Sequence, residues 1–209
     1  FICVQIQNTV GDQLWKKRLI ENKIPLLSEV DTRALVLRLR SGGTPWGALV
    51  EAVSEAQALE KAQKLIASSR KIEKDWVWIA SRKEAEKRAG KNPKGPRVAV
   101  LDFGTKENIL RELEKFCKEI IIFPSRANAS EVLATKPDGI MLTNGPGDPQ
   151  DVEVAQDTIR EFIGKLPIFG ICMGHQILGL ALGGKTYKLK FGHRGSNHPI
   201  RDTLLNEIY

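Results

Sequence analysis

One short pattern constrains this chain more than any other. It is Gly170-Ile171-Cys172-Met173-Gly174, a G-x-C-x-G sequence. An apolar run over 167–171 leads into the cysteine, and a helix-like apolar run over 177–182 follows it. This is the form of a nucleophile elbow, a tight strand-to-helix turn with the nucleophile at its apex. A Cβ atom at either flank would crowd such a turn, so glycine is needed at both positions.

A cysteine at such an apex faces the free N–H groups and the positive dipole end of the helix that follows it. Both features favour the thiolate, which is the attacking species in cysteine chemistry. The alternative is a buried structural cysteine between a strand and a helix. The flanking glycines and the polar pair His175-Gln176 favour the nucleophile, so Cys172 is the candidate catalytic residue.

From Arg97 onward, short apolar runs alternate with segments that have helical spacing. This rhythm predicts an α/β fold with a parallel sheet and helices on both faces. The predicted strands are 98–103, 120–123, 139–142 and 167–171, and the predicted helices between them are 106–116, 129–135 and 154–163. Sites in such sheets form at the carboxyl ends of strands. Cys172 and the loop 144–149 both follow predicted strands, so the topology places them on the same rim.

The loop Asn144-Gly145-Pro146-Gly147-Asp148-Pro149 is dense in residues that form turns. By itself it indicates a tight turn after a buried strand. Beside a nucleophile elbow it gains a second interpretation, because glycines let backbone N–H groups approach an oxyanion closely. The N–H groups of Met173 and Gly147 would then form a two-donor oxyanion hole.

Residues 1–80 are predicted to form a separate N-terminal unit. Asp31 is placed to cap a helix that Gly42-Gly43 ends. The segment 46–53 has the pattern of a strand, and 54–68 has the pattern of a helix.

Residues 81–96 are predicted to be a linker, and 97–209 a second domain. The segment 82–97 carries seven Lys/Arg against two Asp/Glu, which is most of the chain's net charge of +7. No aromatic residue interleaves it to stack bases. A solvated linker is therefore favoured over a nucleic-acid surface, and no nucleic-acid partner is expected.

Other classes of function have weaker signals. No apolar run approaches the roughly 20 residues that span a bilayer, so no membrane partner is expected. Cys3, Cys117 and Cys172 include no C-x-x-C pair, which argues against a disulfide framework and a thiolate zinc site and favours a reducing, cytoplasmic location. His193 and His198 leave a metal pair open, but their spacing is loose and no Cys or carboxylate cluster accompanies them, so no metal is expected.

A base for the thiol is not evident in the sequence. His175 lies too close to Cys172 along the expected helix, and no convincing His-x-Glu pair is present. A triad base needs a third group to orient it. From the residues alone, the nucleophile and the oxyanion donors have candidates and the base has none.

Several motifs together resemble one enzyme family. The elbow 170–176 and the loop 144–149 resemble the class I, or triad-type, glutamine amidotransferases. The stretches 191–199 and 31–35 are similar to those of the small subunits of carbamoyl phosphate synthetases, and 102–110 resembles the first strand and helix of the same family. The resemblance covers essentially the whole chain.

The resemblance implies a smaller N-terminal mixed α/β domain followed by a flavodoxin-like, parallel-sheet amidotransferase domain. It implies that Cys172 forms a γ-glutamyl thioester and releases ammonia. It implies that Met173 and Gly147 carry the oxyanion donors. It further implies that Gly145, Gly147, Met173 and Gln176 line the site for L-glutamine.

The resemblance also implies a partner, the carbamoyl phosphate synthetase large subunit, which uses ATP and bicarbonate. ATP and Mg are expected on that partner, and no cofactor is expected in this chain. The family's catalytic His and Glu are expected after Tyr209 and the start of its N-terminal domain before Phe1, so we expect a fragment, inactive alone. The alternatives are the glutaminase of another amidotransferase and a non-catalytic module that retains the fold.

Overall fold

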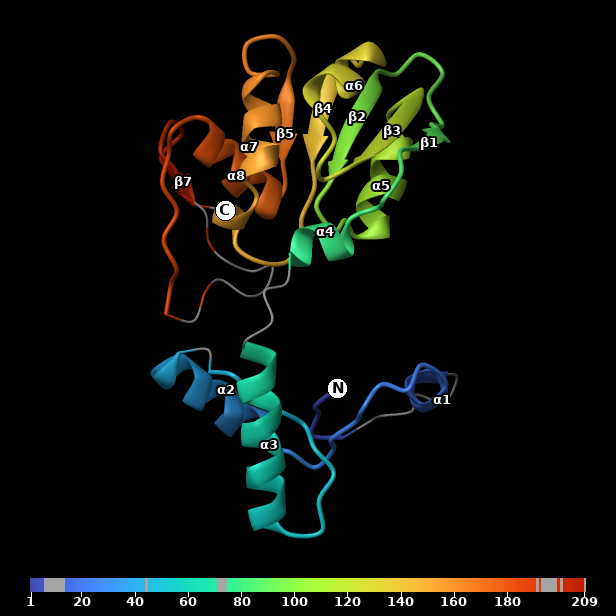
Figure 1. The fold of residues 1–209 in the computed structure, drawn as a ribbon. Helices are drawn as coiled ribbons and strands as arrows, with labels where there is room; N and C mark the ends of the chain where they lie inside the picture. Colours follow the sequence, from blue (N-terminus) through green and yellow to red (C-terminus); the bar gives the residue numbers. More distant parts are fainter. Residues whose placement is uncertain are drawn as a thin grey trace. The chain divides into compact units, whose positions relative to one another are not determined.

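The computed structural model describes residues 1–5, 14–43, 45–70, 75–190, 192, 199 and 201–208. They divide into two compact units, Phe1–Ile72 with Lys188–Tyr209, and Glu73–Tyr187 (Figure 1). The composition of the sequence predicts different boundaries, at residues 80 and 96. Helix α4 (Trp76–Ala80) belongs to the second unit because the buried side chain of Val77 packs into the core around its sheet.

Within the described residues of the first unit there are three helices and a short strand pair. These are α1 (Leu14–Glu21), α2 (Thr32–Gly42), α3 (Glu55–Arg70), β6 (Arg201–Asp202) and β7 (Glu207–Ile208). Helix α2 has the predicted caps. Asp31 Oδ1 accepts the N–H of Ala34 at 2.8 Å, and Gly43 follows the helix at a φ of 89°. Among the described helices of the whole chain, none combines the length and apolar character that crossing a bilayer requires.

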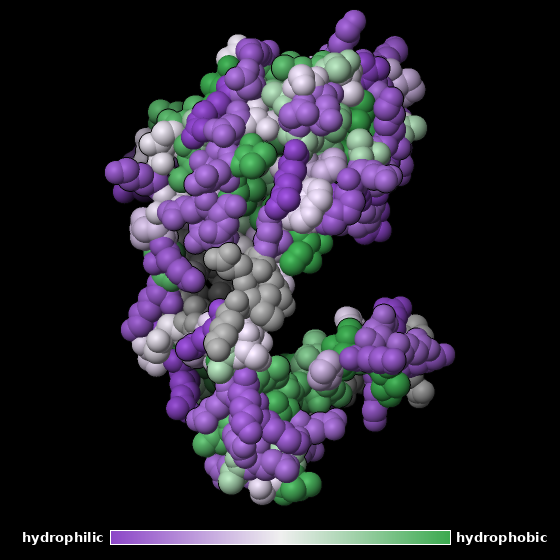
Figure 2. All heavy atoms as spheres, in the orientation of Figure 1, coloured by the Kyte–Doolittle hydropathy of each residue, from purple (hydrophilic) through white to green (hydrophobic). Residues whose placement is uncertain are grey.

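One strand that was predicted for the N-terminal unit is not formed. The expected strand over 46–53 is absent, since these residues form no ladder, and an isolated parallel bridge joins Ile2 to Leu27. Leu19 is the one buried apolar side chain among the described residues of this unit, whereas Trp46 and Val53 are exposed. Figure 2 shows hydrophobic residues on this unit's surface. An apolar run without a partner strand does not become a strand.

The second unit is built on a five-stranded sheet with the order β1-β3-β2-β4-β5. Its strands are β1 (Glu86–Ala89), β2 (Arg97–Asp102), β3 (Glu119–Pro124), β4 (Gly139–Leu142) and β5 (Ile168–Gly170). All pairs are parallel except β1 with β3 at one edge. The parallel strands have the order of flavodoxin-like doubly wound sheets. The predicted α/β fold class is confirmed.

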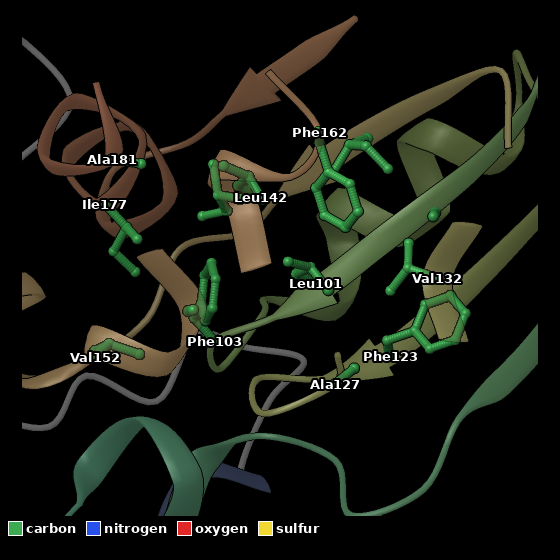
Figure 3. Packing of buried hydrophobic residues seen from close by; sticks show 14 of the residues in the cluster. Leu101, Phe103, Phe123, Ala127, Val132, Leu142, Val152, Phe162, Ile177 and Ala181 are labelled. Carbon is green, nitrogen blue, oxygen red and sulfur yellow. The ribbon is translucent and has the colours of Figure 1, made fainter. Parts of the chain in front are cut away.

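Helices cover both faces of this sheet. On one face lies α5 (Glu107–Glu114), and on the other lie α6 (Ala129–Ala134), α7 (Glu153–Arg160) and α8 (Met173–Ala181). Alternation along β2 separates the two cores, because successive side chains of a strand point to opposite faces. Val100 joins the core under α5, whereas Leu101 joins the other core with Leu142 and Ile177 (Figure 3).

The charged segment predicted to be a linker is partly an edge strand. β1 pairs antiparallel with β3, and a Cβ atom on Gly90 would lie 1.8 Å from the carbonyl oxygen of Cys117, so the backbone is closely packed. Two of its arginines also have acidic partners. Arg82 pairs with Glu86 and Asp102, and Arg88 pairs with Glu86, Glu107 and Glu114. The linker prediction is wrong here because this segment pairs with β3 and because its arginines have partners on β2 and α5 as well as on β1.

Candidate active site

Cys172 lies at the apex of the turn between β5 and α8. Its backbone has φ 51° and ψ −106°, and its side chain is exposed. A positive φ is uncommon for a residue with a Cβ, and such strained positions cost of order 1–3 kcal/mol. They cluster at functional sites, where the surrounding structure maintains them. The backbone thus has the strained turn that the G-x-C-x-G pattern predicts.

The two flanking glycines are required by close packing. A Cβ atom on Gly170 would lie 2.6 Å from the backbone nitrogen of His175. A Cβ atom on Gly174 would lie 2.4 Å from the carbonyl oxygen of Leu142. Real Cβ contacts this short essentially never occur. Both glycines therefore let the first turn of α8 pack directly onto the ends of β4 and β5.

Hydrogen bonds join the elbow to the strand ends beside it. The N–H of Gly174 donates to the carbonyl of Thr143 at 2.9 Å, and the N–H of Ile171 donates to the carbonyl of Leu142 at 2.9 Å. The buried hydroxyl of Thr143 accepts the N–H of Phe103 at 2.9 Å and donates to the carbonyl of Asn144 at 2.9 Å. The carboxyl ends of β2, β4 and β5 are thereby tied into one rim.

The glycine-rich loop after β4 also depends on its glycines. A Cβ atom on Gly145 would lie 2.2 Å from the carbonyl oxygen of Phe103. Gly147 is exposed and has a φ of 92°, a conformation that favours glycine. Asp148 Oδ1 then accepts the N–H of Gln150 at 3.0 Å, which starts the short 3₁₀ helix η1 (Pro149–Asp151).

The predicted site residues fall into two neighbouring groups. Met173 and Gln176 follow Cys172 in the first turns of α8, and Gly145 and Gly147 lie in the loop after β4. The side chain of Met173 is buried, while its N–H is the first of the helix and has no intrahelical acceptor. Gln176 is exposed, and its N–H donates to the carbonyl of Cys172 at 3.1 Å. The catalytic roles of these five residues stay predictions.

Asn144 is a residue of this rim that has no predicted role of its own. The side chain of Asn144 bridges the loop after β4 and the loop after β2. Its Oδ1 accepts the N–H of Lys106 at 3.1 Å, and its Nδ2 donates to the carbonyl of Gly104 at 3.1 Å. Its signal in the sequence is a polar residue just past a buried strand, which also fits an ordinary turn.

The side chain of Asp102 anchors the loop after β2 through hydrogen bonds. Its buried carboxylate accepts the N–H groups of Gly104 and Thr105 at 2.9 and 2.8 Å, and the N–H and guanidinium of Arg82 at 3.0 and 2.8 Å. Burial raises the pKa of Asp102, but the hydrogen bonds from Thr105, Arg82 and Gly104 outweigh it and leave this pKa below its usual value. The carboxylate therefore stays ionised at neutral pH.

Neither a base nor a metal site emerges within the described ranges. His175 is exposed on α8, and His193 and His198, considered as a metal pair from the sequence, lie outside the described residues. The described residues contain no group of three or more His, Cys, Asp or Glu that could hold a metal ion.

A cleft lies beside the glycine-rich loop. Its volume is about 620 Å³. Its lining includes Gly147 and Asp148 of that loop, together with Trp76, Ser125 and Arg126. Cys172 does not line it. The cleft therefore adjoins the loop, and the thiol of Cys172 lies outside its lining.

Comparisons with known proteins show which family this chain resembles. The chain is 44% identical over 207 residues to the carbamoyl phosphate synthase small chain of Bacillus caldolyticus, which covers 99% of this chain and 55% of the relative. It is 44% identical over 191 residues to the small chain of Clostridium perfringens (strain 13 / Type A), covering 91% and 52%.

A third relative is the carbamoyl phosphate synthase pyrimidine-specific small chain of Bacillus subtilis (strain 168). It is 42% identical over 185 residues, which cover 88% of this chain and 49% of the relative. The chain spans about half the length of these relatives. A family model described as "Glutamine amidotransferase class-I" matches residues 99–209. This match takes in more than half of the residues, and the chain belongs to the class-I glutamine amidotransferase family.

Proposed function

We propose that the complete protein is the glutaminase subunit of a carbamoyl phosphate synthetase. In this proposal it hydrolyses L-glutamine through Cys172 and supplies the ammonia to a large subunit, which makes carbamoyl phosphate from bicarbonate and ATP. The observation that carries the proposal is the strained backbone of Cys172, φ 51°, at the apex of the β5–α8 turn. The names of the relatives support a carbamoyl phosphate synthetase over other amidotransferases.

The chemistry begins at the thiolate of Cys172, which forms a bond to the amide carbon of glutamine while the carbonyl electron pair moves onto oxygen. The N–H groups of Met173 and Gly147 stabilise that oxyanion. When the C–N bond breaks, the nitrogen takes up a proton and leaves as ammonia, and a γ-glutamyl thioester remains. Water adds to the thioester carbon, and departure of the thiolate yields glutamate. Gly145 and Gln176 complete the glutamine site.

Three proton transfers need a general acid–base group beside the thiol. They are loss of the thiol proton, protonation of the leaving nitrogen and activation of water. The proposal assigns them to a His–Glu pair in the part of the relatives' length that this chain does not span. ATP and magnesium are assigned to the large subunit, and no cofactor is assigned to this chain.

The test is Cys172→Ser in the complete protein, assembled with its large subunit. Glutamine-dependent synthesis of carbamoyl phosphate is expected to fall ~10³-fold or more, because a serine hydroxyl lacks thiolate character. Synthesis from added ammonium is expected to stay at the wild-type rate, since that chemistry belongs to the partner. Cys3→Ser is the matched control, with the same chemical change at a half-buried cysteine of the first unit.

Other outcomes separate the alternatives. Wild-type protein that hydrolyses glutamine without supporting carbamoyl phosphate synthesis would be the glutaminase of another amidotransferase. Wild-type protein that does not hydrolyse glutamine would be a non-catalytic module with the same fold. Glutamine-dependent turnover by Cys172→Ser near the wild-type rate would remove Cys172 from the mechanism.

A further inference from the structure

The glycine-rich loop is held at its beginning and exposed in its middle. Thr143 is fully buried, and Gly145 packs against the carbonyl of Phe103. Gly147, by contrast, is exposed, and a Cβ atom placed on it would meet one neighbour, at the ordinary distance of 3.6 Å. The orientation of the Gly147 N–H therefore depends on how firmly the start of the loop is anchored.

Asn144 provides side-chain anchoring at that start. Its carboxamide accepts the N–H of Lys106 and donates to the carbonyl of Gly104, both at 3.1 Å, so one planar group bonds two backbone sites on the neighbouring loop. These partners lie about 40 residues before it in the sequence. The bonds thus fix the relative position of the loops after β2 and β4.

The partner loop is itself held in place. Asp102 accepts the N–H groups of Gly104 and Thr105, and Arg82 donates to the same carboxylate. Adjacent strands β2 and β4 carry helices on opposite faces of the sheet, which is the switch point where ligands bind in doubly wound folds. The bridge made by Asn144 spans this switch point.

We propose that Asn144 is a positioning residue for the oxyanion donor of Gly147. Its side chain locks the first residues of the glycine-rich loop onto the loop after β2, so that the N–H of Gly147 keeps one orientation toward the oxyanion. Asn144 itself acts through the backbone and takes no part in the covalent steps. The proposal rests on the proposed function for its catalytic consequence, whereas the claim that Asn144 holds the loop stands on the structure alone.

The test compares Asn144→Ala with Asn92→Ala in the complete protein. Asn92 is a matched control, because its side chain also accepts one backbone N–H, from Lys94, and donates to one carbonyl, that of Phe116. It precedes β2 and so lies toward the amino end of that strand, whereas the elbow lies at the carboxyl ends of the strands. Both changes remove the same two kinds of hydrogen bond, and only one of them touches the rim.

For Asn144→Ala, kcat for glutamine hydrolysis is expected to fall ~10²-fold, since misplacement of a catalytic group by about 1 Å has that effect. KM is expected to change less than threefold, because an oxyanion donor acts mainly in the transition state. The rate at which iodoacetamide alkylates Cys172 is expected to stay at the wild-type value, since alkylation needs the elbow and no oxyanion hole. Asn92→Ala is expected to leave all three quantities unchanged.

A measurement without glutamine keeps the inference separate from the proposed function. Hydrogen exchange at the amide of Lys106, whose N–H donates to Asn144 Oδ1, is expected to be at least tenfold faster in Asn144→Ala than in wild type or Asn92→Ala. Unchanged exchange there would overturn the proposal, whether or not the wild-type protein hydrolyses glutamine. A wild-type kcat in Asn144→Ala, or an alkylation rate that falls together with kcat, would also overturn it, the latter by revealing a general loss of the elbow.

Discussion

The backbone N–H of Gly174 donates to the backbone carbonyl of Thr143 across 2.9 Å, and this bond joins the first turn of α8 to the end of β4. Thr143 in turn bonds Phe103 and the carbonyl of Asn144 through its hydroxyl. The turn that carries Cys172 and the loop that carries Gly147 are therefore parts of one hydrogen-bonded rim. Changes on either side of the bond are expected to reach the other.

Replacing Gly174 by Ala is expected to damage the elbow. The new Cβ atom would lie 2.4 Å from the carbonyl oxygen of Leu142, so α8 must move away from β4. We expect the complete protein to lose about 2–3 kcal/mol in free energy of unfolding, measured by urea titration, and to lose glutamine hydrolysis. Gly179→Ala is the control on the same helix, where a Cβ meets nothing within 4 Å. Gly179→Ala is expected to raise the free energy of unfolding by about 0.5–1 kcal/mol. Equal losses of stability from Gly174→Ala and Gly179→Ala would contradict the packing argument.

Replacing Gly147 by Val is expected to reduce turnover through the backbone. At a φ of 92° a β-branched side chain is strained, so the N–H of residue 147 must shift. Loss of one oxyanion donor typically reduces kcat by ~10²–10³-fold. Gly164→Val carries the same kind of strain at a φ of 77° in open space beyond α7. Steady-state kinetics should show the loss in Gly147→Val alone, and a normal rate there would mean that the loop is only a turn.

Thr143→Val removes a buried hydroxyl with almost no change of shape. The N–H of Phe103 would lose its acceptor, and an unsatisfied buried donor costs about 1–3 kcal/mol. We expect lower stability together with lower kcat, because the start of the glycine-rich loop loses a support. Thr158→Val provides the comparison, since that buried hydroxyl donates to the carbonyl of Ala127 and does not contact the rim. The comparison fails if Thr158→Val lowers kcat per folded molecule as much as Thr143→Val does.

Asp102 is expected to make the free energy of unfolding depend on pH in the acid range. Its pKa is lower in the folded protein than in the unfolded chain, so its contribution is fully present above the unfolded value, about 3.9, and is lost as the pH falls through the folded pKa. Asp102→Asn is expected to cost about 3 kcal/mol at pH 7, because it removes the buried carboxylate that pairs with Arg82, although Glu86 still contacts this guanidinium. In urea titrations the gap between the variant and wild type should shrink below about pH 4.

Asp138→Asn is the control for this acid dependence. Its carboxylate also accepts a backbone N–H, that of Arg97 at 2.7 Å, and its pKa is also lowered, mainly by this bond. Asp138 is exposed, so solvent and salt screen its interactions and a smaller loss is expected. If the difference in free energy of unfolding between wild type and Asp102→Asn stays constant from pH 7 to pH 3, the destabilisation does not come from the charge of Asp102.

Local patterns in the sequence determined the parts of this protein that depend on backbone sterics and short-range periodicity. The G-x-C-x-G pattern predicted the strained turn at Cys172, because only glycine fits where α8 meets β4 and β5. Apolar runs predicted the four parallel strands to within one or two residues, and Asp31 predicted the start of α2. The signal for each of these features lies in a few residues that are close together along the chain, although the contacts that hold the elbow reach Leu142 on β4.

Tertiary structure decided the features whose partners are far apart in the sequence. The segment 86–89 is a strand because β3 pairs with it and because Arg88 reaches Glu107 and Glu114, whereas the more strand-like run 46–53 has no ladder to join. Asn144 becomes an anchor because folding brings Gly104 and Lys106 beside it. Strand pairing and side-chain bridges depend on how well two distant segments fit each other across the sheet. A short stretch of sequence contains only one of the two partners, so it cannot predict the pairing.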